Sequence, residues 1–205
     1  MSTIYSHIAN ATGELNDLKP TIEAAFSKVL PIVEKELKAD GIDIFFLSAP
    51  MLAVPEYGIG GNTPGPNHIY ISFDPNSDKI TEEGLIETLL HEIHHCMRWR
   101  GPGYGDSLGE AMITEGLACL YEEMHKGSPP VYAEVDITQE QIARSQSVLN
   151  SDQYDHSEWF FGSKDIIRWF GYTYGYRLCK KYATQNNTNA AEMVNIDPDV
   201  ILAIT

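Results

Sequence analysis

Residues 81–100 read TEEGLIETLLHEIHHCMRWR, and this stretch has the pattern of a strongly amphipathic helix. Leu85, Leu89 and Ile93 recur at helical spacing, so one face of the helix is apolar. The threonine at its start can cap the N-terminus, and the two glutamates that follow suit the first turn. Arginines suit the last turn, and the Gly-Pro-Gly at 101–103 predicts the end of the helix.

An H-E-x-x-H motif lies inside this helix, as His91-Glu92-Ile93-His94-His95. Residues four apart share a helix face, so His91 and His95 can offer two imidazole nitrogens to one metal ion. Glu92 is rotated by about 100° from His91, which lets it reach a metal-bound water without being a ligand. His94 points away from the pair, so we expect it to pack or to support a ligand.

A catalytic zinc usually takes three protein ligands and one water, so a third ligand is expected downstream. A second helix is predicted from Asp106 or Ser107 to Lys126, and it carries Glu110, Glu115, Glu122 and Glu123. Glu115 lies among small and apolar residues, where a carboxylate without a partner would be costly. Glu122 and Glu123 have the pattern of surface charges, and the setting of Glu110 is less apolar. Because the turn at 101–105 can fold this helix back beside the first, Glu115 is the predicted third ligand.

The remaining sequence predicts an α+β fold, mostly helical with a small sheet in the N-terminal half. Further helices are expected over 20–39, from Thr138 to about Leu149, and from the Ser163 region to Tyr182. Short β-favouring runs at Ile42–Leu47 and His68–Phe73 predict strands. The glycine-rich residues 58–67 between them predict a loop or an irregular edge.

Composition favours one soluble domain over residues 1–205. The chain has 205 residues, of which 43% are hydrophobic, so a sizeable core can be buried. Its net charge of −15 argues against nucleic acid or an anionic membrane as the main partner. Three widely spaced cysteines do not suggest a disulfide framework. With no secretory signal and no apolar run that could cross a bilayer, a cytoplasmic location is expected.

H-E-x-x-H followed by a glutamate on the next helix resembles the gluzincin metallopeptidases, with a spacing like that of the thermolysin group. Three segments are closer still to a family of predicted zinc-dependent proteases of unknown function. They are the His-Glu-x-His-His core at 91–95, the Glu-Gly-x-Ala segment at 115–118 and the Gly-Tyr-x-x-Gly-Tyr element at 171–176. The resemblance covers about residues 69–182 and implies a zincin-like domain. Cys119 departs from it, since a carboxylate is expected there.

Aromatic residues crowd the C-terminal third, and such a cluster usually forms core. Gly171 and Gly175 are four apart, which would let a neighbouring backbone approach closely. Zinc peptidases commonly stabilise the oxyanion with a tyrosine or histidine. Tyr172, Tyr176 and His156 are the candidates, and Tyr172 is preferred.

The sequence therefore predicts a zinc metallopeptidase that acts on a peptide or protein substrate. His91, His95 and Glu115 are expected to hold zinc, and Glu92 to take a proton from the attacking water. The strand around Tyr70, or the glycine-rich segment before it, is expected to bind the peptide. Two alternatives remain: a catalytically silent zincin-like binding or regulatory protein, and a metal-free helical interaction protein.

Overall fold

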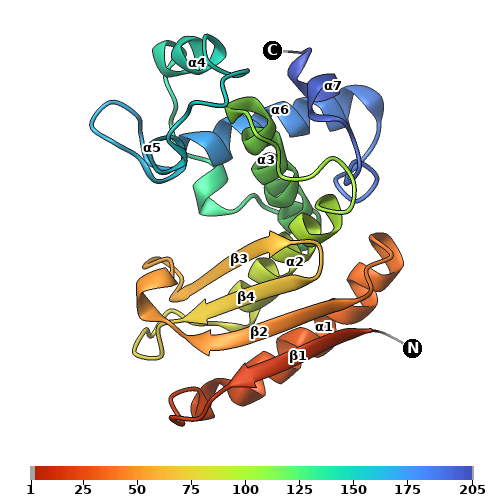
Figure 1. The fold of residues 1–205 in the computed structure, drawn as a ribbon, viewed down its shortest axis with the longest axis vertical. Coiled ribbons are helices and arrows are strands. Elements are labelled where there is room, and N and C mark those ends of the chain that lie inside the picture. The colour runs from red at the N-terminus through yellow and green to blue at the C-terminus, as the bar shows by residue number, and fades with distance from the viewer. Residues whose placement is uncertain (1–2, 205) are drawn as a thin grey trace. The chain divides into compact units, whose positions relative to one another are not determined.

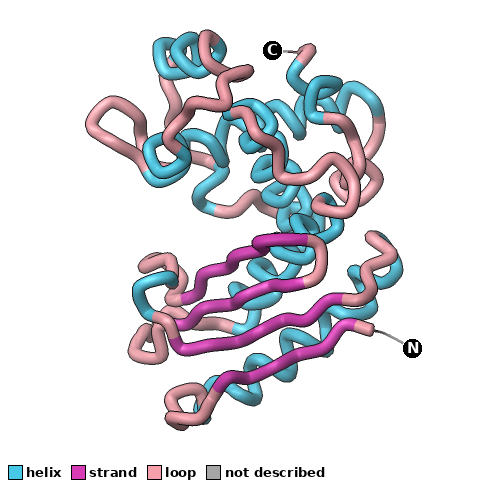
Figure 2. The backbone as a smooth tube through the Cα atoms, in the orientation of Figure 1, coloured by secondary structure: helices cyan, strands magenta, loops and turns pink. Residues whose placement is uncertain are grey.

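A computed structural model describes residues 3–204 of the chain. The chain divides into two compact units, the first ending at Trp99 and the second beginning at Arg100. All strands among the described residues belong to the first unit, and the second contains only helices and loops, as Figure 2 shows. The predicted α+β class, with a small sheet in the N-terminal half, is confirmed.

The first unit is built on a four-stranded sheet with the order β1-β2-β4-β3 (Figure 1). Strands β1 (Ile4–Ala9), β2 (Ile42–Ser48) and β4 (His68–Phe73) run parallel. Strand β3 (Ile59–Gly65) pairs antiparallel with β4 and forms one edge. Helix α1 (Lys19–Glu36) connects β1 to β2, so this part of the chain is a β-α-β crossover.

The two faces of the sheet differ because side chains alternate along each strand. Ile44 and Phe46 of β2 and Ile69 and Ile71 of β4 are fully buried, on the face that α1 and α2 cover (Figure 1). On the other face, the rings of His7, Phe45 and Tyr70 stack in a row, with centroids 4.8 and 5.4 Å apart.

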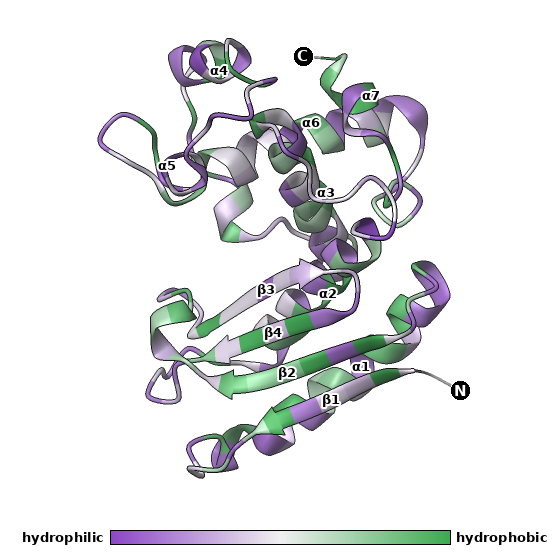
Figure 3. Cartoon of the chain, in the orientation of Figure 1, coloured by the Kyte–Doolittle hydropathy of each residue, from purple (hydrophilic) through white to green (hydrophobic). Residues whose placement is uncertain are grey.

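Strand β3 is the irregular edge that was one of the two predictions for residues 58–67. Its pairing with β4 shifts register between Asn62 and Gly65. Glycine and proline weaken a strand, and an edge position tolerates them because only one side must pair. In Figure 3 β3 is pale, because its residues have intermediate hydropathy, whereas β2 is largely green, because most of its residues are hydrophobic. The two predicted strands are found as β2 and β4, and β2 is one residue longer than predicted. Strand β1 was not predicted.

Helix α2 (Glu82–Arg98) carries the H-E-x-x-H motif and packs against α1, β3 and β4. It begins as predicted, with Thr81 as the N-cap whose Oγ1 accepts a hydrogen bond from the Gly84 N–H at 3.0 Å. Helix α1 ends three residues earlier than predicted, and Lys38 follows it with φ 56°.

The second unit is centred on α3 (Leu108–Lys126), which packs against α6 (Phe170–Asn186). A capping box between Ser107 and Glu110 starts α3, and Gly127 ends it with φ 82°. Gly175 lets the two backbones approach, because a Cβ there would collide with the Met112 carbonyl. The shorter helices are α4 (Gln139–Gln146), α5 (His156–Phe161) and α7 (Pro198–Leu202).

The helix predicted from the Ser163 region begins only at Phe170, so this prediction of its start was wrong. Residues before it form a turn in which the Ser163 hydroxyl accepts hydrogen bonds from the N–H groups of Asp165 and Ile166, both at 3.2 Å. Trp169 then adopts φ 69°, a left-handed conformation that cannot continue a helix backward. Helices α5 and α7 were not predicted, and α4 is shorter than expected.

The described residues 3–204 contain no helix long and apolar enough to cross a membrane. The expectation that residues 1–205 act as one metallopeptidase domain stays a prediction.

Candidate metal centre

The two histidines of the motif face each other on α2. The Nε2 atoms of His91 and His95 are 2.9 Å apart, and the ring planes meet at 85°. Both side chains are buried, with 7% and 5% of their surface exposed. Converging imidazole nitrogens on one helix face are donors that zinc prefers. The pair therefore fits two positions of a zinc coordination sphere.

Glu92 extends from α2 toward the edge strand β3. Thr63 donates a hydrogen bond from Oγ1 to Glu92 Oε2 at 2.6 Å, and the same hydroxyl lies 3.1 Å from the Glu92 carbonyl oxygen. Gly61 lies beside the carboxylate, which occupies the space that a side chain at this position would need. His94, which was expected to pack or to support a ligand, is fully buried on the same helix.

Glu115 belongs to the second unit and is 5% exposed. Tyr104 donates a hydrogen bond from its hydroxyl to Glu115 Oε1 at 2.6 Å. The Tyr104 carbonyl in turn accepts a hydrogen bond from the Thr114 hydroxyl at 3.0 Å, which ties the loop to α3. Burial raises the pKa of Tyr104 well above its usual 10, and the charge of Glu115 and the neighbouring Tyr172 raise it further. The phenol therefore keeps its proton and remains a donor to Glu115.

Two further polar aromatic residues lie within the electrostatic reach of Glu115. Burial lowers the pKa of His156, and the charges of Glu115 and Asp155 partly oppose this shift. The His156 ring stacks on Phe160 with centroids 4.2 Å apart. Burial raises the pKa of Tyr154, and Glu115 adds to the shift. At neutral pH these side chains are a neutral imidazole and a neutral phenol, and both can donate a hydrogen bond.

The two tyrosines proposed from the sequence lie in different surroundings on α6. Tyr172 is half-buried and packs its ring against Tyr132 and Phe160, each with centroids 5.2 Å apart. The Tyr172 side chain is also close enough to influence the pKa of Tyr104. Tyr172 therefore belongs to the same group of side chains as Glu115.

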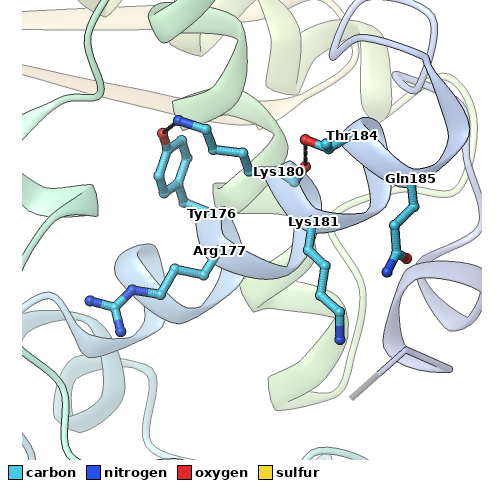
Figure 4. Close-up of a pocket in the computed structure, with 6 residues that line it drawn as sticks. All are labelled: Tyr176, Arg177, Lys180, Lys181, Thr184 and Gln185. Atoms are coloured by element: carbon cyan, nitrogen blue, oxygen red, sulfur yellow. Dashed lines mark hydrogen bonds between the residues drawn. The ribbon is translucent and has the colours of Figure 1, made fainter.

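Tyr176 has a different environment, beside a hollow of about 320 Å³ on α6 (Figure 4). Its hydroxyl donates to Glu123 Oε2 at 2.8 Å and accepts from Lys180 Nζ at 2.7 Å. Burial raises the pKa of Tyr176 to about 12. This hydroxyl is committed to an ion pair between α3 and α6, which leaves Tyr172 and His156 as the better oxyanion candidates.

The other glutamates of α3 have structural partners. Glu110 closes the capping box, where its Oε2 accepts from the Asp106 and Ser107 N–H groups at 3.0 and 2.8 Å. The prediction that Glu122 is a surface charge was wrong, since it is 1% exposed. Tyr132 donates a hydrogen bond to Glu122 Oε1 at 2.5 Å. Glu122 is seven residues after Glu115, and that spacing places both on one helix face.

Cys119 lies between these two glutamates and is fully buried. Burial raises the pKa of its thiol well above 9, and the charges of Glu122 and Glu115 raise it further. The thiol is thus protonated and fills space like a small apolar residue. Where the family resemblance leads one to expect a carboxylate, this chain has a neutral group.

The sequence did not reveal Thr63 as a neighbour of Glu92, or Tyr104 and Tyr154 as neighbours of Glu115. Thr63 and Glu92 are 29 residues apart, and Tyr104 lies in a glycine-rich turn with no helical or strand periodicity. The sequence signal that could have pointed to Tyr104 is its position, because it is a bulky residue among glycines in the short connection between the two predicted helices.

A family model with the description "Predicted Zn-dependent protease (DUF2268)" matches residues 19–203. The match includes the H-E-x-x-H helix, all of α3 and the Gly-Tyr-x-x-Gly-Tyr element. No curated protein and no solved structure matches the chain.

Proposed function

The chain belongs to this family of predicted zinc-dependent proteases, and from that membership we propose that it is a zinc metallopeptidase. In this proposal His91, His95 and Glu115 hold the metal. The observation that carries it is the pair of Nε2 atoms 2.9 Å apart on the helix that also bears Glu92. Glu115 suits a third ligand because it is a buried carboxylate whose Oε1 is fixed by Tyr104.

A bound zinc ion would lower the pKa of a water toward neutrality and polarise the scissile carbonyl. Glu92 accepts a proton from the attacking water at its carboxylate and passes it to the leaving amine. Tyr172 donates a hydrogen bond to the oxyanion that develops on the substrate, and His156 is a second donor of suitable protonation state.

The peptide substrate binds along strand β3 in this proposal. Strand β4, which contains Tyr70, is paired on both sides by β2 and β3, so it has no edge to offer. Strand β3 is an edge strand, packs against α2 and contacts Glu92 through Gly61 and Thr63. An extended peptide that adds to this edge would run past the catalytic carboxylate.

Metal content tests the ligand assignment. The wild-type protein, purified without chelator, should carry close to one zinc per chain, and His91→Ala or His95→Ala should lose most of it. His68→Ala removes an exposed histidine of the same unit and should keep the full zinc content. Equal zinc content in all three variants, with their circular dichroism unchanged, would reject the histidine pair.

Glu92→Gln tests turnover separately, because it preserves shape and leaves the ligands intact. We expect it to retain zinc and to lose cleavage of a peptide library by at least about a hundredfold. Zinc-loaded wild-type protein that cleaves no member of the library would favour the silent binding scaffold instead. Loss of zinc in Glu92→Gln would contradict the division of roles between base and ligands.

A further inference from the structure

We propose that two residues of β3 position the Glu92 carboxylate, Thr63 by a hydrogen bond and Gly61 by leaving it space. This inference rests on the proposed function, in which Glu92 is the general base. The family description gives neither residue a role, and both lie outside the H-E-x-x-H motif, on a strand about thirty residues before Glu92.

The Thr63 contact is short and buried. Oγ1 of Thr63 lies 2.6 Å from Glu92 Oε2, and the two residues are 8% and 6% exposed. A hydrogen bond to a carboxylate at this distance is of the stronger, charge-assisted kind. Because this hydrogen bond holds Oε2 of the carboxylate, it restricts the rotation of the Glu92 side chain. The other oxygen, Oε1, is left to accept a proton in the proposed mechanism.

Thr63 is itself held in place by the residue that follows the same helix. The indole Nε1 of Trp99 donates a hydrogen bond to the Thr63 carbonyl at 2.9 Å. Glu92 and Trp99 are seven residues apart, which is close to two helical turns, so both lie on the side of α2 that faces β3. Glu92 of α2 and Trp99, the C-cap residue of that helix, therefore contact Thr63 at its hydroxyl and at its carbonyl.

Gly61 supplies the space that this arrangement needs. Alternation along β3 directs Ile59, Gly61 and Thr63 to the face that α2 covers. A Cβ at Gly61 would overlap the carboxylate of Glu92. Gly61 does not have positive φ, so its backbone conformation does not require glycine. Glycine is required at position 61 because the Glu92 side chain occupies the space that a Cβ would need.

Substitution of the hydroxyl tests the proposal in the zinc-loaded enzyme. Thr63→Val keeps the shape and removes the donor, and we expect kcat to fall about 10- to 100-fold because a small displacement of a catalytic group has effects of this size. KM and zinc content should stay near the wild-type values. Thr63→Ser restores the donor and should recover kcat to within about threefold of wild type.

Two further variants sharpen the comparison. Thr88→Val is the matched control, since it removes a hydroxyl that donates to the Gly84 carbonyl at 2.9 Å on the same helix, and it should behave as wild type. Gly61→Ala should lower kcat as Thr63→Val does, with zinc retained. If wild-type enzyme is active and Thr63→Val has the same kcat, the positioning role is wrong while the proposed function stands.

Infrared spectroscopy tests the Thr63–Glu92 hydrogen bond directly, and it needs neither turnover nor bound metal. The carboxylate band of Glu92 is identified in metal-free protein as the band lost in Glu92→Gln. It should shift in Thr63→Val and keep its position in Thr63→Ser and Thr88→Val. An unshifted band in Thr63→Val overturns the proposal. If wild-type enzyme cleaves no peptide, the proposed function fails, and the infrared shift still decides whether Thr63 holds Glu92.

Discussion

At the scale of single residues, Glu115 and Glu110 of α3 have hydrogen-bond partners of different kinds. Tyr104 binds Glu115 Oε1, and the neighbouring polar side chains are aromatic donors that stay neutral at physiological pH. Glu110, by contrast, is used at the helix N-terminus, where its carboxylate satisfies two backbone N–H groups. The two residues are matched in type and share a helix, but they have different hydrogen-bond partners.

Replacement of each glutamate by glutamine tests this difference. Glu115→Gln removes the negative charge and should weaken zinc binding by at least about a hundredfold, as measured by competition with a chromogenic chelator. Glu110→Gln preserves a capping box and should leave the zinc affinity unchanged. If Glu110→Gln is the damaging variant, the third ligand has been assigned to the wrong residue of α3.

At the scale of elements, two glycines determine how closely α3 and α6 pack. A Cβ at Gly175 would collide with the Met112 carbonyl, and one at Gly116 with the backbone at Gly175. The buried Cys179 thiol is 3.6 Å from the Ile113 carbonyl oxygen along the same contact. The close approach of the backbones was expected from the Gly-Tyr-x-x-Gly-Tyr element, and it is confirmed at Gly175. At Gly171 the neighbour is the ring of Phe160 instead.

Gly175→Ala should therefore lower the free energy of unfolding by about 1–3 kcal/mol, the usual cost of overpacking a core. Gly65→Ala is the control, because nothing lies within 4 Å of a Cβ at that position and its φ is not positive. Urea denaturation followed by circular dichroism measures both. Equal stability of the two variants would mean that the helices can separate without penalty.

Helix periodicity accounted for α2, which has a strong apolar stripe, and end signals accounted for both α2 and α3, which begin at side-chain caps on Thr81 and Ser107. The same signals failed near Ser163, where the turn is set by a serine hydroxyl and a left-handed Trp169 that the aromatic pattern conceals. Strand β3 depends on β4 for its pairing, so its glycine-rich sequence could not distinguish an edge strand from a loop. Motif spacing predicted His91, His95 and Glu92 as candidate site residues, whereas Thr63 is brought to Glu92 only by the fold.

At the scale of the whole molecule, the proposed zinc would act as a ligand of the native state. A ligand that binds only folded protein stabilises it by mass action, by about 2.7 kcal/mol when its free concentration is a hundred times Kd. The histidine pair and Glu115 are far apart in the unfolded chain, which cannot offer the same site. The apparent stability should consequently depend on zinc.

Thermal denaturation with and without a chelator tests this dependence. The chelator should lower the Tm of wild-type protein and leave the Tm of the His91→Ala/His95→Ala double variant unchanged. A hydroxamate should raise the Tm of the zinc-loaded protein, because a catalytic zinc has a coordination position that the hydroxamate can occupy. A chelator effect without a hydroxamate effect would indicate a closed structural zinc.

The composition of β3 also bears on how copies of this protein behave in a crowded solution. An exposed sheet edge is a template on which other chains can stack into fibrils. Three of the seven residues of β3 are glycine and one is proline, and its register is interrupted before Gly65. These features make it a poor nucleus for cross-β growth, since glycine and proline disfavour extended stacking. The chain can thus present an edge strand beside Glu92 with little tendency to aggregate through it.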